Sequence, residues 1–413
     1  MGKVTELVCV KCGRTYEPGS DITCPECGLE GILDVLYDYD LAREGFRRNP
    51  LSRRNEPTMF RYLELLPFDE IPSEMLKVGW TPLYRFERLG EAIDHAQVYL
   101  KDDTVNPSGS LKDRASVVGV TMALTEGRSA IACASTGNAA SSLAVLAASA
   151  GLRSYIFVPE TIPIAKLYQI ATCATRVFRV RGTYEDAFDV ATDAITRWNW
   201  FNRNCAINPY LVEGKKTCSL EIFEQLGYRV PDWVVVSVGD GCIISGQYKA
   251  FKELRLVGET SRVPRLLAVQ AEGASPIVDA FKSSRDLVPV KATTFADSIR
   301  VGKPRNWRKA LRALRESDGE AITVSDEEIL ESMLLLGNKC GLFAEPAGAA
   351  GFAGFLKARK LGIISRDEIV VVLVTGSGLK DPSSLEKKIE VVDIEASGDA
   401  VGEYVDGQGQ DKA

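Results

Sequence analysis

Residues 232–246 read DWVVVSVGDGCIISG, an apolar run that ends in a glycine-containing turn. Such a run, bounded by turn residues, is typical of a buried strand in a parallel sheet. Similar runs recur along the chain, separated by helical stretches rich in alanine and leucine. The strands expected from these runs are residues 97–101, 129–135, 154–159, 176–180, 232–239, 265–273 and 368–376. This alternation predicts an α/β fold with two doubly wound, mostly parallel sheets that carry helices on both faces.

The composition is that of a globular protein without an electrostatic preference for nucleic acid. The chain has 413 residues, of which 45% are hydrophobic and 26% charged, and its formal net charge is −6. A negative charge gives no reason to expect nucleic acid or an anionic membrane as a partner. No run approaches the roughly 20 apolar residues of a membrane span, and the N-terminus lacks the apolar segment of a signal peptide. We therefore expect a cytoplasmic protein.

Four of the ten cysteines form two C-x-x-C pairs, Cys9 with Cys12 and Cys24 with Cys27. Two such pairs are able to place four thiolates tetrahedrally around Zn²⁺, so we predict a structural zinc site in a ribbon-like knuckle over residues 1–36. The alternatives are a pair of redox dithiols or a site that has lost its metal. The knuckle has more acidic than basic residues, which disfavours nucleic-acid binding. We expect the other six cysteines to be core thiols.

Two turns carry groups suited to an amino acid. GSLKDR, residues 109–114, places Lys112 at the start of a predicted helix, where the helix dipole favours the uncharged amine. A lysine there is either a solvated charge or an amine that reacts with carbonyl groups. ASTGNAASS, residues 134–142, ends a strand in hydroxyls, a glycine and Asn138 before an alanine-rich helix. Its amides and hydroxyls are suited to hold a carboxylate.

Two further turns complete a candidate cofactor site. SVGDGCIISG, residues 237–246, joins a strand to a helix and suits a phosphate, and VTGSGLKDP, residues 374–382, places Thr375 at the end of an apolar strand. An amine, a carboxylate cradle, a phosphate cradle and a hydroxyl together fit pyridoxal 5'-phosphate and an amino acid. A dinucleotide site is disfavoured because the glycine turn lacks G-x-G-x-x-G spacing, and a Walker motif is absent.

In their order and spacing, these motifs resemble the threonine synthase family of fold-type II pyridoxal phosphate enzymes. The matching stretches are NPSGSLKDR, ASTGN, YLVEGKKT, SVGDGCIISG, AEPAGAA and TGSGLKDP. The resemblance runs from the knuckle to about residue 390. It implies a tryptophan synthase β-like fold and the activity of a pyridoxal-phosphate-dependent lyase on a small amino-acid substrate. It also implies a homodimer, by analogy with the family.

The resemblance also implies roles for individual residues. Lys112 is expected to be catalytic and to carry the cofactor as a Schiff base, Asn138 to hydrogen-bond its phenolic oxygen and Thr375 to meet the pyridine nitrogen. The residues implied to bind the cofactor are Lys112, Asn138, Gly239, Asp240, Gly241, Cys242, Ile243 and Thr375. The residues implied to receive the substrate's carboxylate are Ser135, Thr136 and Gly137.

The chain departs from the family where the substrate's phosphate is bound. Threonine synthases act on O-phosphohomoserine and hold its phosphate partly through an N-S-V-N-P-Y-R stretch and an asparagine that closes the glycine loop. Here those positions hold Cys205, Ala206, Leu211 and Ile243. A thiol, a methyl group and two apolar side chains replace groups able to make charge-assisted hydrogen bonds. The cations able to compensate from other directions are Lys215, Lys216, Arg203 and Arg300.

On these substitutions we favour a paralogue that eliminates or replaces a β-substituent, similar to serine/threonine ammonia-lyases or to cysteate synthase. TTFADSI, residues 293–299, and GLFAEPAGAA, residues 341–350, also look more like ammonia-lyases, whereas SIRVGKPRNWRKALRAL, residues 298–314, remains threonine-synthase-like. The first alternative is a true threonine synthase, which converts O-phosphohomoserine and water to threonine and phosphate. The second is a non-catalytic regulatory protein that keeps pyridoxal phosphate and zinc.

The domain organisation follows from the same patterns. The expected parts are the knuckle (1–36), a large cofactor-binding domain (37–105 and 212–395), a small α/β domain (106–211) and a disordered tail (396–413). His95 is the only histidine and precedes a strand in DHAQVYL, so we expect it to be a surface residue and not a catalyst.

Overall fold

The computed structural model describes residues 3–19, 22–386, 389, 391–396, 398 and 401. The chain divides into two compact units, residues 1–381 and residues 382–413. The second unit contains the short 3-10 helix Pro382–Leu385. The disordered tail predicted over 396–413 lies outside the described residues, except for residues 396, 398 and 401.

The larger sheet has six strands in the order β12-β11-β10-β13-β5-β4. These strands are β4 (Leu83–Tyr84), β5 (Val98–Asp102), β10 (Trp233–Ser237), β11 (Arg265–Ala271), β12 (Glu320–Val324) and β13 (Val370–Val374). All neighbours are parallel except β4 and β5. Every residue of β10 and β13 is buried. These two strands are covered on both faces, which explains why their sequences are continuous apolar runs.

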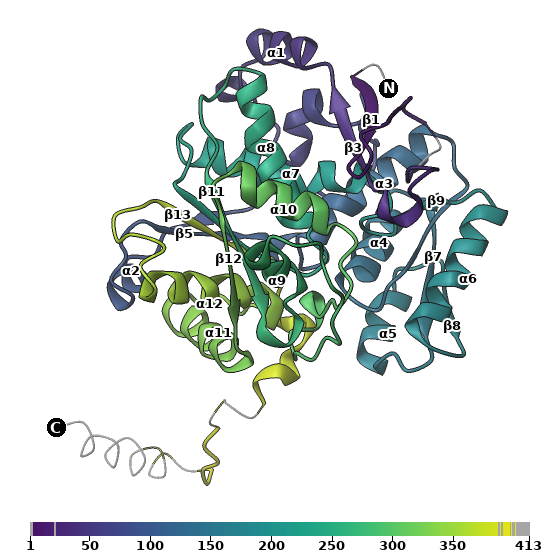
Figure 1. The fold of residues 1–413 in the computed structure, drawn as a ribbon. Coiled ribbons are helices and arrows are strands. Elements are labelled where there is room, and N and C mark those ends of the chain that lie inside the picture. The colour runs from purple at the N-terminus through teal and green to yellow at the C-terminus, as the bar shows by residue number, and fades with distance from the viewer. Residues whose placement is uncertain are drawn as a thin grey trace. The chain divides into compact units, whose positions relative to one another are not determined.

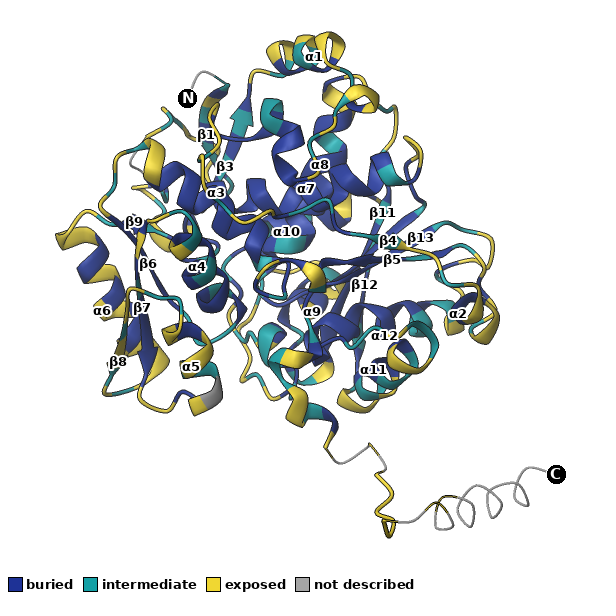
Figure 2. Cartoon of the chain, turned by 180° about the vertical axis from the view of Figure 1, so that it is seen from behind, coloured by how far each residue is buried: buried dark blue, intermediate teal, exposed yellow. Residues whose placement is uncertain are grey.

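Helices cover both faces of this sheet (Figure 1). One face carries α7 (Tyr210–Gln225), α8 (Cys242–Leu256) and α10 (Trp307–Glu316), and the other carries α11 (Asp326–Cys340) and α12 (Pro346–Lys360). The remaining helices of this part are α1 (Tyr39–Arg48), α2 (Glu87–Ala92) and α9 (Pro276–Ser283). Figure 2 shows that exposed residues gather on the outer helices while the sheet is buried. No helix in the described ranges is long and apolar enough to cross a membrane.

The smaller sheet has four parallel strands in the order β8-β7-β6-β9. They are β6 (Ala130–Ala134), β7 (Arg153–Pro159), β8 (Arg176–Val180) and β9 (Phe201–Asn202). The helices α3 (Lys112–Thr125) and α4 (Asn138–Ser149) share a core with one face, and α6 (Tyr184–Arg197) with the other. The last helix, α5 (Ile164–Ala171), packs against α4 and β8. The two sheets confirm the predicted fold class, and all seven expected strands are present.

The cysteine knuckle is a small antiparallel sheet in the order β2-β1-β3, with β1 at Val4–Cys9, β2 at Thr15–Tyr16 and β3 at Leu33–Tyr37. Asp34 of β3 anchors it to the larger part of the fold. Its carboxylate accepts hydrogen bonds from Lys309 Nζ (3.2 Å) and Arg312 Nη2 (2.6 Å), and Lys249 Nζ lies 3.4 Å away. Burial opposes the charged form, but these three cations hold the pKa of Asp34 well below its ordinary value.

A buried ion network fixes the start of α3. The guanidinium of Arg114 is fully buried and donates to Asp103 just after β5 (2.7 and 2.8 Å) and to Glu221 of α7 (2.5 and 2.9 Å). Lys101 of β5 also donates to Glu221 (2.7 Å). Because these groups come from three elements, the network sets the position of the residue two places earlier, Lys112.

The surface position predicted for His95 is wrong. The residue is only 1% exposed, its Nε2 lies 3.0 Å from the carbonyl oxygen of Glu368, and its ring packs edge-on against Phe355 with 5.1 Å between ring centroids. Burial lowers the pKa of His95. The local pattern DHAQVYL does not show that α12 covers the loop before β5, so the sequence missed this contact.

Candidate active site

Lys112 begins α3 after a turn that its neighbours hold in place. Asp113 accepts hydrogen bonds from the amide (2.6 Å) and the hydroxyl (2.5 Å) of Ser108. The amide of Leu111 donates to the carbonyl oxygen of Thr375 (2.9 Å). These bonds place the side chain of Lys112 in the wall of a cavity.

Short antiparallel bridges join this turn to two others. Ser110 pairs with Gly376, and Ala344 pairs with Ser377. The amide of Glu345 donates to the carbonyl oxygen of Gly376 (2.9 Å). A Cβ atom on Gly376 would lie 2.4 Å from Glu345 Oε1, so only glycine leaves room for this carboxylate. The turns after β5 and β13 and the turn before α12 therefore form one rigid wall.

The cavity behind this wall has a volume of about 110 Å³. All the residues predicted to bind the cofactor line it, namely Lys112, Asn138, Gly239, Asp240, Gly241, Cys242, Ile243 and Thr375. They come from turns that are far apart in the sequence. The lining also includes Ser298 and Glu345, to which the sequence analysis gave no role, and Cys205 and Lys215.

The glycine turn at the start of α8 suits an anion. Gly241 is the N-cap residue and has φ = +87°, a left-handed conformation that favours glycine. A Cβ atom there would also approach the Cβ of Ala310 to 3.0 Å. No side chain of the described residues caps α8, so the amides of its first turn are available to a ligand. Asp240 accepts a hydrogen bond from the amide of Arg305 (2.6 Å), and burial raises the pKa of this carboxyl to about 6.

A second pocket adjoins this cavity and shares Asn138, Ser298, Glu345 and Ala347 with it. Of the residues predicted to receive a carboxylate, Thr136 and Gly137 line the second pocket. Ser135 accepts a hydrogen bond from the amide of Gly137 within the turn (3.3 Å).

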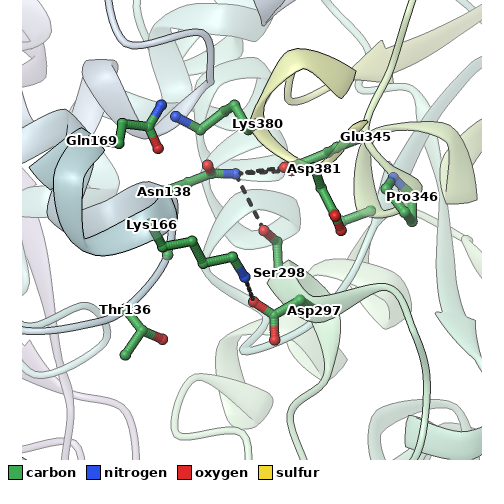
Figure 3. Close-up of a pocket in the computed structure, with 12 residues that line it drawn as sticks. Thr136, Asn138, Lys166, Gln169, Asp297, Ser298, Glu345, Pro346, Lys380 and Asp381 are labelled. Carbon is green, nitrogen blue, oxygen red and sulfur yellow. Dashed lines mark hydrogen bonds and ion pairs between the residues drawn. The ribbon is translucent and has the colours of Figure 1, made fainter. Parts of the chain in front are cut away.

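Figure 3 shows side chains from both walls of this second pocket. Lys166 of α5 forms an ion pair with Asp297 on the opposite wall (2.6 Å). The amide of Asn138 points toward Ser298 and Glu345.

Glu345 is the main site residue that the sequence analysis missed. The side-chain amide of Asn138 donates to both of its oxygens (2.8 and 3.1 Å) and lies 3.2 Å from Ser298 Oγ. Burial raises the pKa of Glu345. The motif AEPAGAA was recognised in the sequence, but nothing local shows that its glutamate meets Asn138, which is 207 residues away in the chain.

A second lysine, Lys215, lines the cavity together with Lys112. Burial and the nearby charge of Lys215 lower the pKa of Lys112. The amine of Lys215 donates to Cys205 Sγ (2.7 Å). A hydrogen bond from Cys242 and the charges of Lys215 and Arg203 lower the pKa of the Cys205 thiol well below its ordinary value, against the effect of burial.

The residues at which the sequence departs from the threonine synthase motifs occupy different places. Ile243 and Cys205 line the cavity. Leu211 of α7 is fully buried and packs against Gly119 of α3, and Ala206 is buried with φ = +69°. Neither Leu211 nor Ala206 belongs to the lining described above. Ile243 is therefore the apolar substitution that faces the cavity.

The four cysteines of the knuckle lie together. The sulfur atoms of Cys9, Cys12, Cys24 and Cys27 are all within 4.8 Å of one another, close enough to hold a zinc ion. Cys24 Sγ also lies 2.9 Å from the hydroxyl of Tyr16.

The chain matches the family model described as pyridoxal-phosphate dependent enzyme over residues 75–376. The threonine synthase of Methanocaldococcus jannaschii is 41% identical over 380 residues, which are 91% of this chain and 93% of that protein. The threonine synthase of Methanosarcina acetivorans is 38% identical, covering 97% of this chain and 99% of that protein. Among solved structures, threonine deaminase isoform 2 from Solanum lycopersicum superposes with a TM-score of 0.65 at 21% identity, covering 74% of this chain and 86% of the deaminase. The similarity to the deaminase shows that the two proteins share a fold.

Proposed function

Because the chain belongs to the threonine synthase family of pyridoxal-phosphate-dependent enzymes, we propose that it converts O-phosphohomoserine and water to threonine and phosphate. The lyase class itself follows from the family. The observation that carries the proposal is that the half-buried Lys112 lines one cavity with Asn138, Thr375 and the uncapped start of α8. The paralogue favoured from the sequence is weakened because Leu211 packs against α3 and does not line the cavity.

The residues present fit pyridoxal phosphate. The amides at the start of α8 suit its phosphate, and the left-handed conformation of Gly241 forms the turn that precedes them. Lys112 is the residue for covalent attachment, and Asn138 and Thr375 offer hydrogen-bonding groups to the ring. When bound, the cofactor supplies an electron sink that makes the Cα proton of an amino acid removable.

The chain's own residues then bind the substrate and move its proton. The start of α4, with Ser135, Thr136 and Gly137, is the proposed cradle for the substrate's carboxylate. Lys112 is the proposed base that takes the Cα proton. Burial and Lys215 lower its pKa, so more of this amine is uncharged at neutral pH than in an exposed lysine.

A β-eliminating enzyme of the ammonia-lyase kind is the second candidate. Ile243 favours it, because an apolar side chain in the cavity suits a substrate without a phosphate. A cysteate-synthase-like reaction starts from O-phosphoserine, so the apolar Ile243 does not favour it.

A turnover screen of the purified holoprotein distinguishes these candidates. We expect threonine and phosphate in equal amounts from O-phosphohomoserine, with little product from L-serine, L-threonine, O-phosphoserine or O-acetylserine. A 2-oxo acid from L-serine or L-threonine, without threonine from O-phosphohomoserine, would establish the β-eliminating candidate instead. If no amino acid were converted, the non-catalytic regulatory alternative would stand.

We also propose that the knuckle binds one structural Zn²⁺ per chain through Cys9, Cys12, Cys24 and Cys27. We expect Cys24→Ser to lose the zinc and to lower the midpoint of thermal unfolding by about 5 °C or more, because a structural metal contributes to the folding free energy. Metal analysis and a thermal melt check this. Cys340→Ser, outside the cluster, is the control and should change neither quantity. A wild-type protein that contains no zinc after zinc-supplemented expression contradicts the proposal.

A further inference from the structure

Lys215 is a buried cation that forms no ion pair with a carboxylate among the residues the structure describes, and its one partner there is the Cys205 thiol. It lies on α7, is 1% exposed, and lines the same cavity as Lys112. Its amine donates to Cys205 Sγ, and no carboxylate in the described ranges lies within ion-pair distance of it. The next residue, Lys216, is equally buried but forms ion pairs with Glu213 and Glu253, both at 2.6 Å. Buried charges are normally paired in this way.

A second buried cation lies close to this pair. Arg203 is fully buried, and its Nε and Nη2 donate to the hydroxyl of Ser116 (3.1 and 3.0 Å). Its Nη1 has no hydrogen-bond partner in the described part of the chain. Its charge acts on both Lys215 and Cys205. Two cations therefore share one thiol, and neither of them forms an ion pair with a carboxylate in the described part of the chain.

Such an arrangement is costly unless an anion binds there. The start of α8 already offers backbone amides for one phosphate, the one proposed above for the cofactor. The amine of Lys215 is a separate donor, and it comes from a different helix of the same cavity. Lys215 and Lys112 line the same cavity, so one bound amino acid is able to meet both side chains.

We propose that Lys215, supported by Arg203, binds the anionic end of the substrate's side chain, so that the enzyme selects amino acids carrying a phosphate or a similar dianion. The inference rests on the proposed function. It names a cation in the cavity lining that offers the substrate's phosphate the charged hydrogen bond that the apolar Ile243 does not supply. It also accounts for an apolar Ile243 in a cavity that takes a charged substrate.

The test compares the Lys215→Met holoprotein with wild type in isothermal titration with inorganic phosphate. We expect the affinity for phosphate to fall about ten- to a hundredfold, the usual effect of losing one hydrogen bond to a charged group. Lys215→Arg should restore most of it. The control is Lys360→Met, which removes an exposed lysine at the end of α12 and should leave the affinity unchanged.

Two further measurements separate this inference from its competitors. Equilibrium dialysis should show unchanged affinity of Lys215→Met for pyridoxal phosphate. With the phosphorylated substrate of the turnover screen, KM should rise far more than kcat falls. Weaker cofactor binding with unchanged affinity for inorganic phosphate would overturn the inference, since Lys215 would then serve the cofactor. If wild type converts no amino acid, the proposed function fails, and the phosphate titration still decides whether the subsite exists.

Discussion

Lys112→Ala protein is expected to fold normally and to lose turnover by about 10³-fold or more. The substitution removes the amine that is proposed both to attach the cofactor and to take the Cα proton. The cofactor should dialyse away, and the visible absorbance that accompanies its attachment to lysine should disappear. The measurements are initial rates on the best substrate of the screen and absorbance spectra after dialysis.

The matched control for this prediction is Lys282→Ala, which removes a lysine near the end of α9, outside the cavity. It should retain wild-type turnover and cofactor content. A Lys112→Ala protein with unchanged turnover would falsify the assignment of Lys112. Exogenous primary amines that restored part of the rate would support its role as base.

Arg114→Met is expected to lower the free energy of unfolding by about 3–5 kcal/mol. The reason is that Asp103 and Glu221 would keep their buried carboxylates without the guanidinium that now contacts both. Denaturant unfolding measures the change. The control is Arg366→Met, whose ion pair with Asp94 is 65% and 67% exposed, so that its removal should cost about 1 kcal/mol or less.

The decrease in the free energy of unfolding caused by Arg114→Met should also depend on pH. Burial opposes the charge on Glu221, but Arg114 and Lys101 hold its pKa at about 2, below its ordinary value. A carboxyl with a lowered pKa stabilises the fold fully above its unfolded-state pKa and loses this contribution as the pH falls. The difference between Arg114→Met and wild type should therefore be largest at neutral pH and shrink below about pH 4. Equal losses at pH 7 and pH 3 would contradict this explanation.

Short stretches of sequence were enough to predict the buried strands and the turns that line the cavity. The apolar runs located β10 and β13, and the turn chemistry located Lys112, Asn138, Gly241 and Thr375 around one cavity. Two-residue strands such as β4 and β9 were not predicted, because their existence depends on a neighbour and not on their own residues. The domain boundaries, the homodimer and the roles of the individual site residues stay predictions.

The features that the sequence did not reveal are contacts between distant segments. Glu345 meets Asn138 across 207 residues, and Arg114 meets Glu221 across 107. The burial of His95 likewise depends on Phe355 of α12. The sequence analysis noted Lys215 only as one of four cations able to compensate. The structure shows what the sequence does not: Lys216 forms ion pairs with two carboxylates, whereas Lys215 contacts a thiol.

The anchoring of the knuckle through Asp34 has a consequence for how this family varies. Lys249, Lys309 and Arg312 belong to helices of the larger sheet, yet their common counter-charge comes from a strand near the N-terminus. Without the N-terminal segment, Lys309 and Arg312 would lose this carboxylate, whereas Lys249 would keep its ion pair with Glu213. Relatives that lack the knuckle should therefore carry neutral residues in place of Lys309 and Arg312.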